Sequence, residues 1–342
     1  MATIYDVAKK ACVSPKTVSR VINGEAPVGP RTREAVEAAI HQLGYRPSNA
    51  ARMMRSSRSG LVGLITGAIS RGTDGQPQGL PDLLIVQAIQ KVMAETGMTL
   101  MIADTGGRDE KVPDLVATFA QHQVEGLLYV AGSHRQVDLP RTEGVPLVLA
   151  NCYDLDGRVA VVPDDRAGQR ALVERLIAAG HHRIAYLTLP PEMIAAGLRG
   201  QGYREALEAA GIACDPALIA PGYADENGEV TRLSAVLDWL LALPVPPSVI
   251  CCGNDELAMR VYGILRARGL KVPEQISVAG YDDHRVISET LYPPLTTVEL
   301  NYRGIGETAA RRLLALIRGE REQHAPELIS GPVRWRASVT EH

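Results

Sequence analysis

The side chains best suited to chemistry in this chain gather near its start, over residues 14–23. Hydroxyl, amide and basic groups of this kind bind base edges and phosphates in protein–DNA interfaces. Their spacing places them on the polar side of one short helix, where they could contact nucleic acid together. An ordinary solvated helical hairpin would carry a similar pattern, so this segment alone leaves both interpretations open. The set comprises Ser14, Lys16, Thr17, Ser19, Arg20 and Asn23, with Pro15 among them.

Two short helices joined by a tight turn would position this set. Apolar residues recur at helical spacing over residues 7–11 and again over 18–22, which predicts one apolar stripe on each helix. Ser14 can accept a hydrogen bond from the free amides at the start of the second helix. Pro15 suits the first position of that helix because no donor is needed there.

A third helix is expected from Pro30 to Leu43. Gly29 stands where a serine or threonine cap would be commoner, so this cap depends on the backbone alone. Three short helices make a core of about 45 residues, which is small for independent stability. We therefore expect support from a dimer partner and from DNA. The residues expected to face inward are Val36, Ala39, Ile40 and Leu43.

These segments together resemble a known family. Residues 3–22, continued by Arg-Thr-Arg-Glu-Ala-Val over 31–36 and Leu-Gly-Tyr-Arg-Pro over 43–47, are similar to the DNA-binding head of the lactose-repressor family of bacterial transcription regulators. The similarity extends through the whole chain. It implies a homodimeric repressor that binds a near-palindromic operator in double-stranded DNA and responds to a small-molecule effector, most commonly a sugar.

The resemblance also implies which residues contact DNA. In family members the linker after the head becomes a hinge helix in the minor groove, where an apolar side chain wedges open a base step. The matching wedge position is Met54, where leucine is usual, and Lys16 and Arg20 are expected to make base and phosphate contacts. The implied set is Thr3, Tyr5, Ser14, Pro15, Lys16, Thr17, Ser19, Arg20 and Asn23 in the head and Asn49, Arg52 and Met54 in the hinge.

Charge is divided unevenly along the chain. Residues 1–60 contain ten basic and four acidic side chains, a net charge of +6, which leaves −9 for the rest of a chain whose total is −3. A basic end on an acidic body is expected when only that end meets phosphates. Five cysteines without disulfide spacing favour a reducing compartment. With no leader and no apolar run of about 18 residues, we expect a cytoplasmic protein without a membrane partner, and the resemblance implies that it is bacterial.

From Leu61 onward, buried strands alternate with amphipathic helices. This alternation predicts an α/β fold of parallel sheets with right-handed crossovers. Two such sets predict two doubly wound lobes with a ligand cleft between them. The resemblance implies lobes of periplasmic-binding-protein type, which a late helix over 304–317 and a terminal strand over 333–339 return to complete.

The expected domain organisation follows from these patterns and from the resemblance. A helix-turn-helix head over 1–46 and a hinge or linker over 47–59 precede a two-lobed effector-binding and dimerisation domain over 60–342. Lobe 1 is expected at about 60–160 and 288–318, and lobe 2 at about 161–287 and 319–342. The chain ends shortly after the terminal strand without a heptad repeat, so we expect dimers and not tetramers.

Polar residues at the ends of the expected strands could form an effector site, because open α/β sheets bind ligands there. Asn151, Asn254 and Asp282 end or follow strands, and Arg199 opens a helix. Amide, carboxylate and guanidinium groups are the set that a sugar pocket needs. Each of these residues could instead have only a local structural role such as helix capping.

The resemblance gives these residues roles. It implies that Arg199 clamps the effector hydroxyls and that Asn254, Asp282 and, more loosely, Asn151 are further anchors. Tyr223 matches an aromatic position that often stacks on the ligand. Capping is the competing role, and we expect Asp164 and Asp255 to serve well as caps.

Enzymes of the same fold fit the sequence less well. Residues 304–309 come near to a dinucleotide fingerprint but do not follow a buried strand. No phosphate-binding loop and no Ser/His/Asp set is evident, and His181-His182 lack metal-spaced partners. We therefore expect no catalytic activity, no cofactor and no metal.

Other binding proteins remain to be compared. A sugar-binding transport protein would share the two lobes but would not carry residues 1–60. Within the family, a co-repressor-dependent or activating regulator stays open as an alternative. The sequence does not identify the effector, the operator or the regulated genes. The glycine-rich loop Ser70–Leu80 could be a lid over the ligand or a surface insertion.

Overall fold

The computed structural model describes residues 2–22, 24–25, 27–45, 58–67, 80–142, 144–223, 230–320 and 325–341. Contacts divide the chain into two units, Met1–Gly60 and Leu61–His342. The predictions for Asn23, for the hinge residues Asn49, Arg52 and Met54, and for residues 70–79 of the glycine-rich loop lie outside the described residues.

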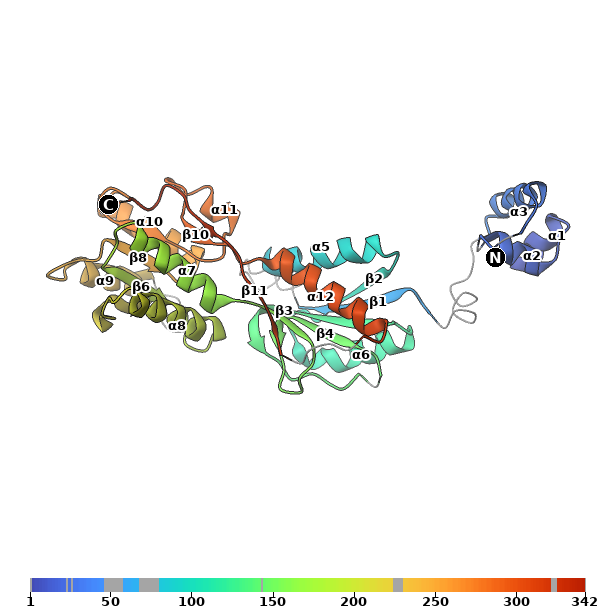
Figure 1. The fold of residues 1–342 in the computed structure, drawn as a ribbon, viewed down its shortest axis with the longest axis horizontal. Helices are drawn as coiled ribbons and strands as arrows, with labels where there is room; N and C mark the ends of the chain where they lie inside the picture. The colour runs from blue at the N-terminus through green and yellow to red at the C-terminus, as the bar shows by residue number, and fades with distance from the viewer. Residues whose placement is uncertain are drawn as a thin grey trace. The chain divides into compact units, whose positions relative to one another are not determined.

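The described residues of the first unit, drawn in blue in Figure 1, contain the helices α1 (Ile4–Lys10), α2 (Pro15–Ile22) and α3 (Pro30–Leu43). The third has the expected bounds. It starts after Gly29, which makes no side-chain cap bond, and is followed by Gly44, whose φ of +57° is in the left-handed region that glycine favours. The apolar stripes meet in one core of Val7, Ala8, Val18, Val21, Val36 and Ala39.

The first lobe of the second unit is built on a six-stranded sheet in the order β11-β5-β4-β3-β1-β2. Every neighbouring pair is parallel, as the strand–helix alternation predicts. The strands are β1 (Leu61–Thr66), β2 (Thr99–Asp104), β3 (Gly126–Gln136), β4 (Leu147–Tyr153), β5 (Ala160–Pro163) and β11 (Glu327–Ile329).

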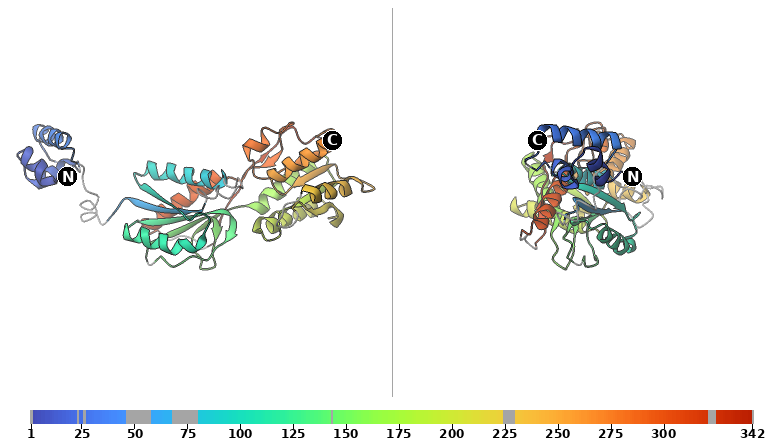
Figure 2. Two further views of the ribbon diagram at one scale, coloured as in Figure 1. Left: turned by 180° about the vertical axis from the view of Figure 1, so that it is seen from behind. Right: turned by 90° about the vertical axis from the view of Figure 1, so that its right-hand side faces the viewer.

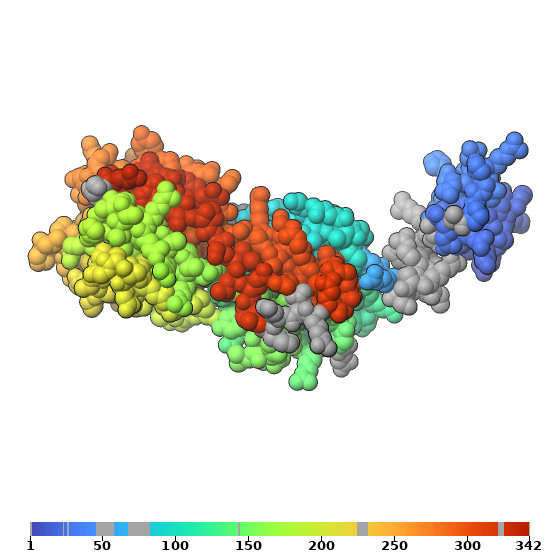
Figure 3. Space-filling model, in the orientation of Figure 1, coloured from blue at the N-terminus to red at the C-terminus, as the bar shows by residue number. Residues whose placement is uncertain are grey.

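Helices cover both faces of this sheet. α5 (Leu80–Glu95) and α12 (Tyr302–Ile317) lie side by side over one face (Figures 1 and 3), and α6 (Val112–Gln121) covers the other (Figures 1 and 2). Alternate residues of β1 serve the two faces: Leu64 packs with α5 and α12, whereas Ile65 packs with α6. Gly63 points the same way as Ile65, and a Cβ there would lie only 2.9 Å from the ring of Phe119.

The second lobe has a four-stranded parallel sheet in the order β7-β6-β8-β9. Its strands are β6 (Ile184–Thr188), β7 (Ile219–Pro221), β8 (Val249–Cys252) and β9 (Ser277–Ala279). α7 (Asp165–Ala178) and α8 (Ile194–Ala209) pack on one face, and α9 (Val230–Leu241) and α10 (Asp255–Ala267) on the other. Both lobes are therefore doubly wound, as predicted.

The chain passes between the lobes three times. It leaves the first lobe after β5 and enters α7, and it returns from β10 (Thr297–Val298) through Asn301 into α12. After β11 it crosses again to β12 (Val333–Arg334), which pairs antiparallel with β10. The short helix α11 (Arg285–Ser288) lies between β9 and β10.

These crossings fall at different residues from those expected. β5 and β11 both lie in the first sheet, although we assigned residues 161–163 and 327–329 to lobe 2. Residues 288–298 belong to lobe 2, because Thr296 bridges to Ala279 beside β9. The sheet to which a short strand belongs depends on partners far away in the chain, and periodicity does not reveal those partners.

The expected terminal strand over 333–339 is regular only at Val333–Arg334. Further along, the Ser338 hydroxyl donates to the Val278 carbonyl and accepts from the Thr296 amide. A side chain thus replaces part of the ladder that a regular strand would form. No helix in the described ranges is long and apolar enough to cross a membrane.

Candidate DNA-binding and effector-binding sites

The polar side of α2 brings most of the expected head residues to one surface. Lys16 and Arg20 are exposed and lie one turn apart, and Tyr5 on α1 is 71% exposed. A hollow of about 400 Å³ lies here, and the described residues that line it are Ile4, Tyr5, Pro15, Lys16, Ser19, Arg20 and Glu25. Five of the expected DNA contacts therefore face one concave surface.

Two of the expected DNA contacts also hold the helix ends. Thr3 caps α1: its hydroxyl accepts from the Asp6 amide at 3.3 Å, and its own amide donates to the Asp6 carboxylate at 2.8 Å. Ser14 accepts from the Thr17 amide at 3.2 Å, which confirms the predicted cap of α2. The Ser14 and Thr17 hydroxyls lie 3.0 Å apart. Loss of either cap would therefore disturb the surface as well as remove an expected DNA contact.

Ser19 differs from its expected place. We predicted it among the exposed polar residues of α2, but it is only 7% exposed. It lines the hollow together with Ile4 and Tyr5, so α1 covers it from the side. Its position lies at the edge of the apolar stripe, where helical spacing does not decide between exposure and burial.

Arg199 is the centre of the polar contacts in the second lobe. We expected it at the start of a helix, but it lies within α8. Its side chain is buried, with 4% of the residue exposed. Its Nε donates to Asp165 Oδ1 at 2.8 Å, one Nη donates to the Gly253 carbonyl, and the other Nη lies 3.5 Å from Asp282 Oδ1. The guanidinium also stacks 3.7 Å from the centre of the Tyr281 ring.

Asp165 is a residue of this site that the sequence analysis missed. It is 1% exposed. Burial acts to raise its pKa, but Arg199 and a hydrogen bond from His134 outweigh burial and hold that pKa below the ordinary value. Its neighbour Asp164 caps α7 by accepting from the Ala167 amide at 3.0 Å, as predicted. The sequence did contain a signal for Asp165. A helix needs only one capping residue, so the second carboxylate of the pair Asp164-Asp165 required another role.

Asp282 presents its carboxylate beside Arg199. Its backbone has a φ of +124°, and its amide donates to the Val298 carbonyl at 2.8 Å. The side chain is 26% exposed. Burial raises the pKa of Asp282 to about 7, with Arg199 acting in the opposite direction. This carboxyl is therefore the accessible acidic partner of the buried arginine.

Asn254 and Tyr223 form a second small group. Asn254 caps α10 by accepting from the Leu257 amide at 2.9 Å, and the Tyr223 hydroxyl donates to the same oxygen at 2.9 Å. Our prediction that Asp255 caps this helix was wrong, because Asn254 takes that position. Asp255 is buried and accepts from the Thr297 hydroxyl and from a backbone amide.

Asn151 is hydrogen-bonded neither to the Arg199 group nor to the pair of Asn254 and Tyr223 in the contacts described above. It lies within β4 and does not end it, and it is 2% exposed. Its φ is +61°, and its amide nitrogen donates to the Ala131 carbonyl of β3 at 3.0 Å. This bond ties two neighbouring strands of the first lobe together.

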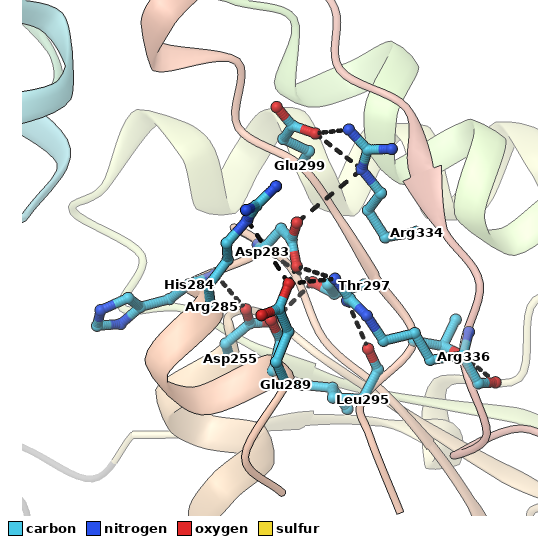
Figure 4. A network of polar contacts seen from close by, with 12 residues as sticks. Asp255, Asp283, His284, Arg285, Glu289, Leu295, Thr297, Glu299, Arg334 and Arg336 are labelled. Carbon is cyan, nitrogen blue, oxygen red and sulfur yellow. Dashed lines mark hydrogen bonds and ion pairs between the residues drawn. The ribbon is translucent and has the colours of Figure 1, made fainter.

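A buried polar network holds the turn after β9 (Figure 4). Asp283, next to Asp282 in the chain, has a φ of +50° and accepts from the Ser288 hydroxyl at 2.8 Å. Arg336 pairs with Asp283 at 2.7 Å and donates to the Leu295 carbonyl at 2.9 Å. The left-handed backbone at both aspartates is thus supported by the C-terminal segment, which the sequence analysis did not foresee.

Three of the four expected lobe 2 side chains follow the carboxyl ends of parallel strands in one sheet. Tyr223 comes after β7, Asn254 after β8 and Asp282 after β9, and Arg199 reaches Asp282 from α8. Donors and acceptors therefore converge at one edge of the sheet, where open α/β folds bind ligands. A guanidinium, a carboxylate, an amide and a phenol can bond the adjacent hydroxyls of a polyol.

Two family models match the chain. Residues 3–48 match bacterial regulatory proteins of the lacI family, and residues 173–339 match the periplasmic binding protein-like domain. The first match covers the three helices of the head, and the second covers most of the second lobe and both returning segments.

Relatives of known identity match over almost the full length. The transcriptional regulator CelR of Thermobifida fusca is 35% identical over 332 residues, which are 93% of this chain and 92% of CelR. A CelR–cellobiose complex is 31% identical, with a TM-score of 0.65 over 99% of this chain and 100% of that one. A lac repressor dimer bound to operator and the anti-inducer ONPF has a TM-score of 0.76 and 26% identity over 99% of both chains. The chain therefore belongs to the lacI family of bacterial regulatory proteins.

Proposed function

We propose that this protein is a homodimeric DNA-binding transcription repressor whose affinity for a near-palindromic operator is controlled by a small metabolite bound between its lobes. One observation carries the proposal. A single chain joins a helix-turn-helix unit with exposed Lys16 and Arg20 to a two-lobed domain in which Arg199 and Asp282 meet at the strand ends. The first part suits DNA and the second suits a small polar ligand.

The DNA contacts follow from the geometry of α2. Lys16 and Arg20 supply the base and phosphate contacts, and Tyr5, Pro15 and Thr17 shape the surface around them. Two copies of this surface, one from each subunit of a dimer, would read two half-sites in successive major grooves. The matched lac repressor was solved as a dimer on its operator, which supports this arrangement.

The effector is a sugar or a related polyol in this proposal. Arg199 and Asp282 bond its hydroxyls, Asn254 and Asn151 anchor it further, and Tyr223 stacks on it. The matched CelR was solved with cellobiose, which supports a carbohydrate. The contact of 3.5 Å between Arg199 and Asp282 is long for a hydrogen bond, so a ligand hydroxyl can displace it with little loss.

Control follows from a population shift. The two lobes have more than one relative arrangement, and one of them keeps the paired hinges of a dimer in place on DNA. An effector that binds another arrangement more tightly weakens operator binding by the ratio of its two affinities. We infer a regulatory and not a catalytic role, since the relatives are transcriptional regulators, and a cytoplasmic location, since its partner is bacterial DNA.

The experiment that tests this function is selection of bound fragments from a genomic library at near-physiological salt. We expect a palindrome of roughly 14–20 base pairs that is read as two half-sites. Arg20→Ala is the control variant. It lacks one exposed side chain proposed to contact a base or phosphate, so it should recover the same site poorly. Recovery of unrelated sequences by both proteins would refute a specific repressor.

The same selection separates the alternative within the family. The repressor described here binds its operator without added metabolite and releases it when cellobiose or another sugar is present. A co-repressor-dependent or activating regulator would instead bind more DNA after the metabolite is added. Repeating the selection with and without a pool of neutral sugars distinguishes these two cases.

A further inference from the structure

A buried hydrogen bond joins the two lobes. His134 belongs to β3 of the first lobe, and Asp165 is the first residue of α7 in the second. Nδ1 of His134 lies 2.9 Å from Oδ2 of Asp165, and the two side chains are 7% and 0% exposed. An ionised carboxylate only accepts hydrogen bonds, so the Nδ1–H group of His134 is the donor.

Asp165 divides its two oxygens between the lobes. Oδ1 accepts from Arg199 in its own lobe, and Oδ2 accepts from His134 in the other. Burial acts to raise the pKa of Asp165, but Arg199 and His134 outweigh it and keep this pKa below its ordinary value. The carboxylate is therefore ionised at neutral pH, and hydrogen bonds to an ionised group are shorter and stronger than neutral ones.

The two carboxylates beside Arg199 hold it differently. Asp165 bonds Nε at 2.8 Å and is fully buried, whereas Asp282 lies 3.5 Å from an Nη atom and is 26% exposed. A guanidinium is planar and rigid, so the short contact at Nε sets the direction in which the Nη atoms point. The Gly253 carbonyl and the Tyr281 ring also contact the guanidinium, and Asp165 fixes its Nε side beside Asp282.

We propose that His134 is a positioning residue that acts across the lobe boundary: by holding Asp165, it orients Arg199. The bond forms only while β3 and the start of α7 keep their present separation, because N–H···O bonds weaken beyond about 3.2 Å. An arrangement of the lobes that breaks it leaves Asp165 with Arg199 alone, and the guanidinium then turns. The orientation of Arg199 by His134 does not depend on the proposed function. The consequence for effector binding does, because it requires Arg199 to bind the effector.

A packing role for His134 makes a different prediction. The ring also meets Tyr153 edge to face, with centroids 6.1 Å apart. An apolar side chain of similar size would retain most of that contact. Positioning instead requires a hydrogen-bond donor at the place of Nδ1, so the chemical identity of the replacement separates the two roles.

The test measures the Arg199 Nε–H proton by nitrogen-15 NMR of the full-length protein, without DNA or metabolite. Arg199→Lys assigns the signal. His134→Leu should speed exchange of this proton with solvent by about tenfold, the factor expected when one hydrogen bond to a charged group is lost. His134→Asn, whose amide nitrogen can take the place of Nδ1, should restore slow exchange. His182→Leu alters an exposed histidine of the same unit and should leave the rate unchanged.

Two results would overturn the inference. One is an exchange rate in His134→Leu within twofold of the wild-type rate. The other is equal acceleration in the leucine and asparagine variants, since a donor would then be irrelevant. If the leucine variant does not fold, His134→Gln, whose amide lies one bond further out, replaces it in the comparison with His134→Asn. The fragment selection described above fails or succeeds independently, because the NMR sample contains no DNA.

Discussion

Arg199→Ala is expected to lower the stability of the second lobe as well as to abolish any response to effector. The arginine is 4% exposed, and the Asp165 carboxylate that it bonds at 2.8 Å is itself buried. Removing one partner of a buried ion pair leaves the other charge uncompensated, which costs about 3–5 kcal/mol. We add nothing for Asp282, because its side chain is 26% exposed and water replaces part of the lost interaction.

The loss should grow with pH. In the wild-type protein the pKa of Asp165 lies below its ordinary value, so this group stabilises the fold above a pH of about 4 and loses that effect as the pH falls through the folded pKa. Without Arg199, burial is opposed by His134 alone, so we expect the pKa of Asp165 to rise above its unfolded value. The unfolded chain then releases a proton that the folded chain keeps, which lowers stability by up to about 1.4 kcal/mol per pH unit.

Urea unfolding followed by circular dichroism at pH 5 and pH 8 measures both effects. Arg204→Ala is the matched control, because it removes an exposed arginine from the same helix. Operator binding of Arg199→Ala should be retained under conditions where the variant is folded, while release by effector is lost. A destabilisation no larger than that of Arg204→Ala, or one that is equal at the two pH values, would refute the assignment of Asp165 and Arg199 as a buried pair.

Three further changes have defined expectations. Arg20→Ala should weaken operator binding by about 1–3 kcal/mol without a change in melting temperature, as measured by fluorescence anisotropy and by a thermal scan. Gly202→Ala should lower the free energy of unfolding in urea by about 1–3 kcal/mol through overpacking, since its Cβ would lie 2.2 Å from the Arg166 carbonyl. Gly197→Ala is the control on the same helix: its Cβ would meet no atom within 4 Å, so urea unfolding should show no destabilisation. Met54→Ala, a prediction from sequence alone, should weaken specific binding by about 1 kcal/mol or more if this residue wedges a base step, and unchanged affinity for the operator would contradict that role.

Elements with strong local signals could be predicted from the sequence. α3 has proline at its first position, an apolar stripe and a glycine after its end, and its bounds matched the prediction at both ends. β1, β4, β6 and β8 are buried apolar runs, which local pattern detects well. β5, β10 and β11 contain two to four residues, and their place depends on partners far away in the chain.

The candidate site was only partly predictable for a related reason. Arg199 and Asp282 lie beside each other as we expected, and Asn254 does so with Tyr223. His134 and Asp165 were missed because their importance comes from a contact between two lobes, and nothing local to either residue indicates it. Ser19 was misplaced because a residue at the margin of an apolar stripe can turn either way.

The sequence alone does not decide which of two adjacent Asp or Asn residues caps a helix. Asp164 caps α7 as predicted, but at the start of α10 the cap is Asn254 and Asp255 is buried. Either residue of an Asn-Asp pair can serve as a cap. Tertiary partners, here the Thr297 hydroxyl that donates to Asp255 at 2.6 Å, decide which residue takes that role.

The three crossings between the lobes also affect how the protein is made. The face of the first sheet that carries Val62 and Leu64 is completed by α12, which follows β5 by about 140 residues. At synthesis rates of about 5–20 residues per second, the ribosome needs roughly 7–28 s to bring α12 out after β5. During that time this apolar face is covered by α5 alone and is open to non-native contacts. A chain interrupted within the second lobe would leave the first lobe incomplete, so such fragments should aggregate or depend on chaperones, although they contain most of its strands.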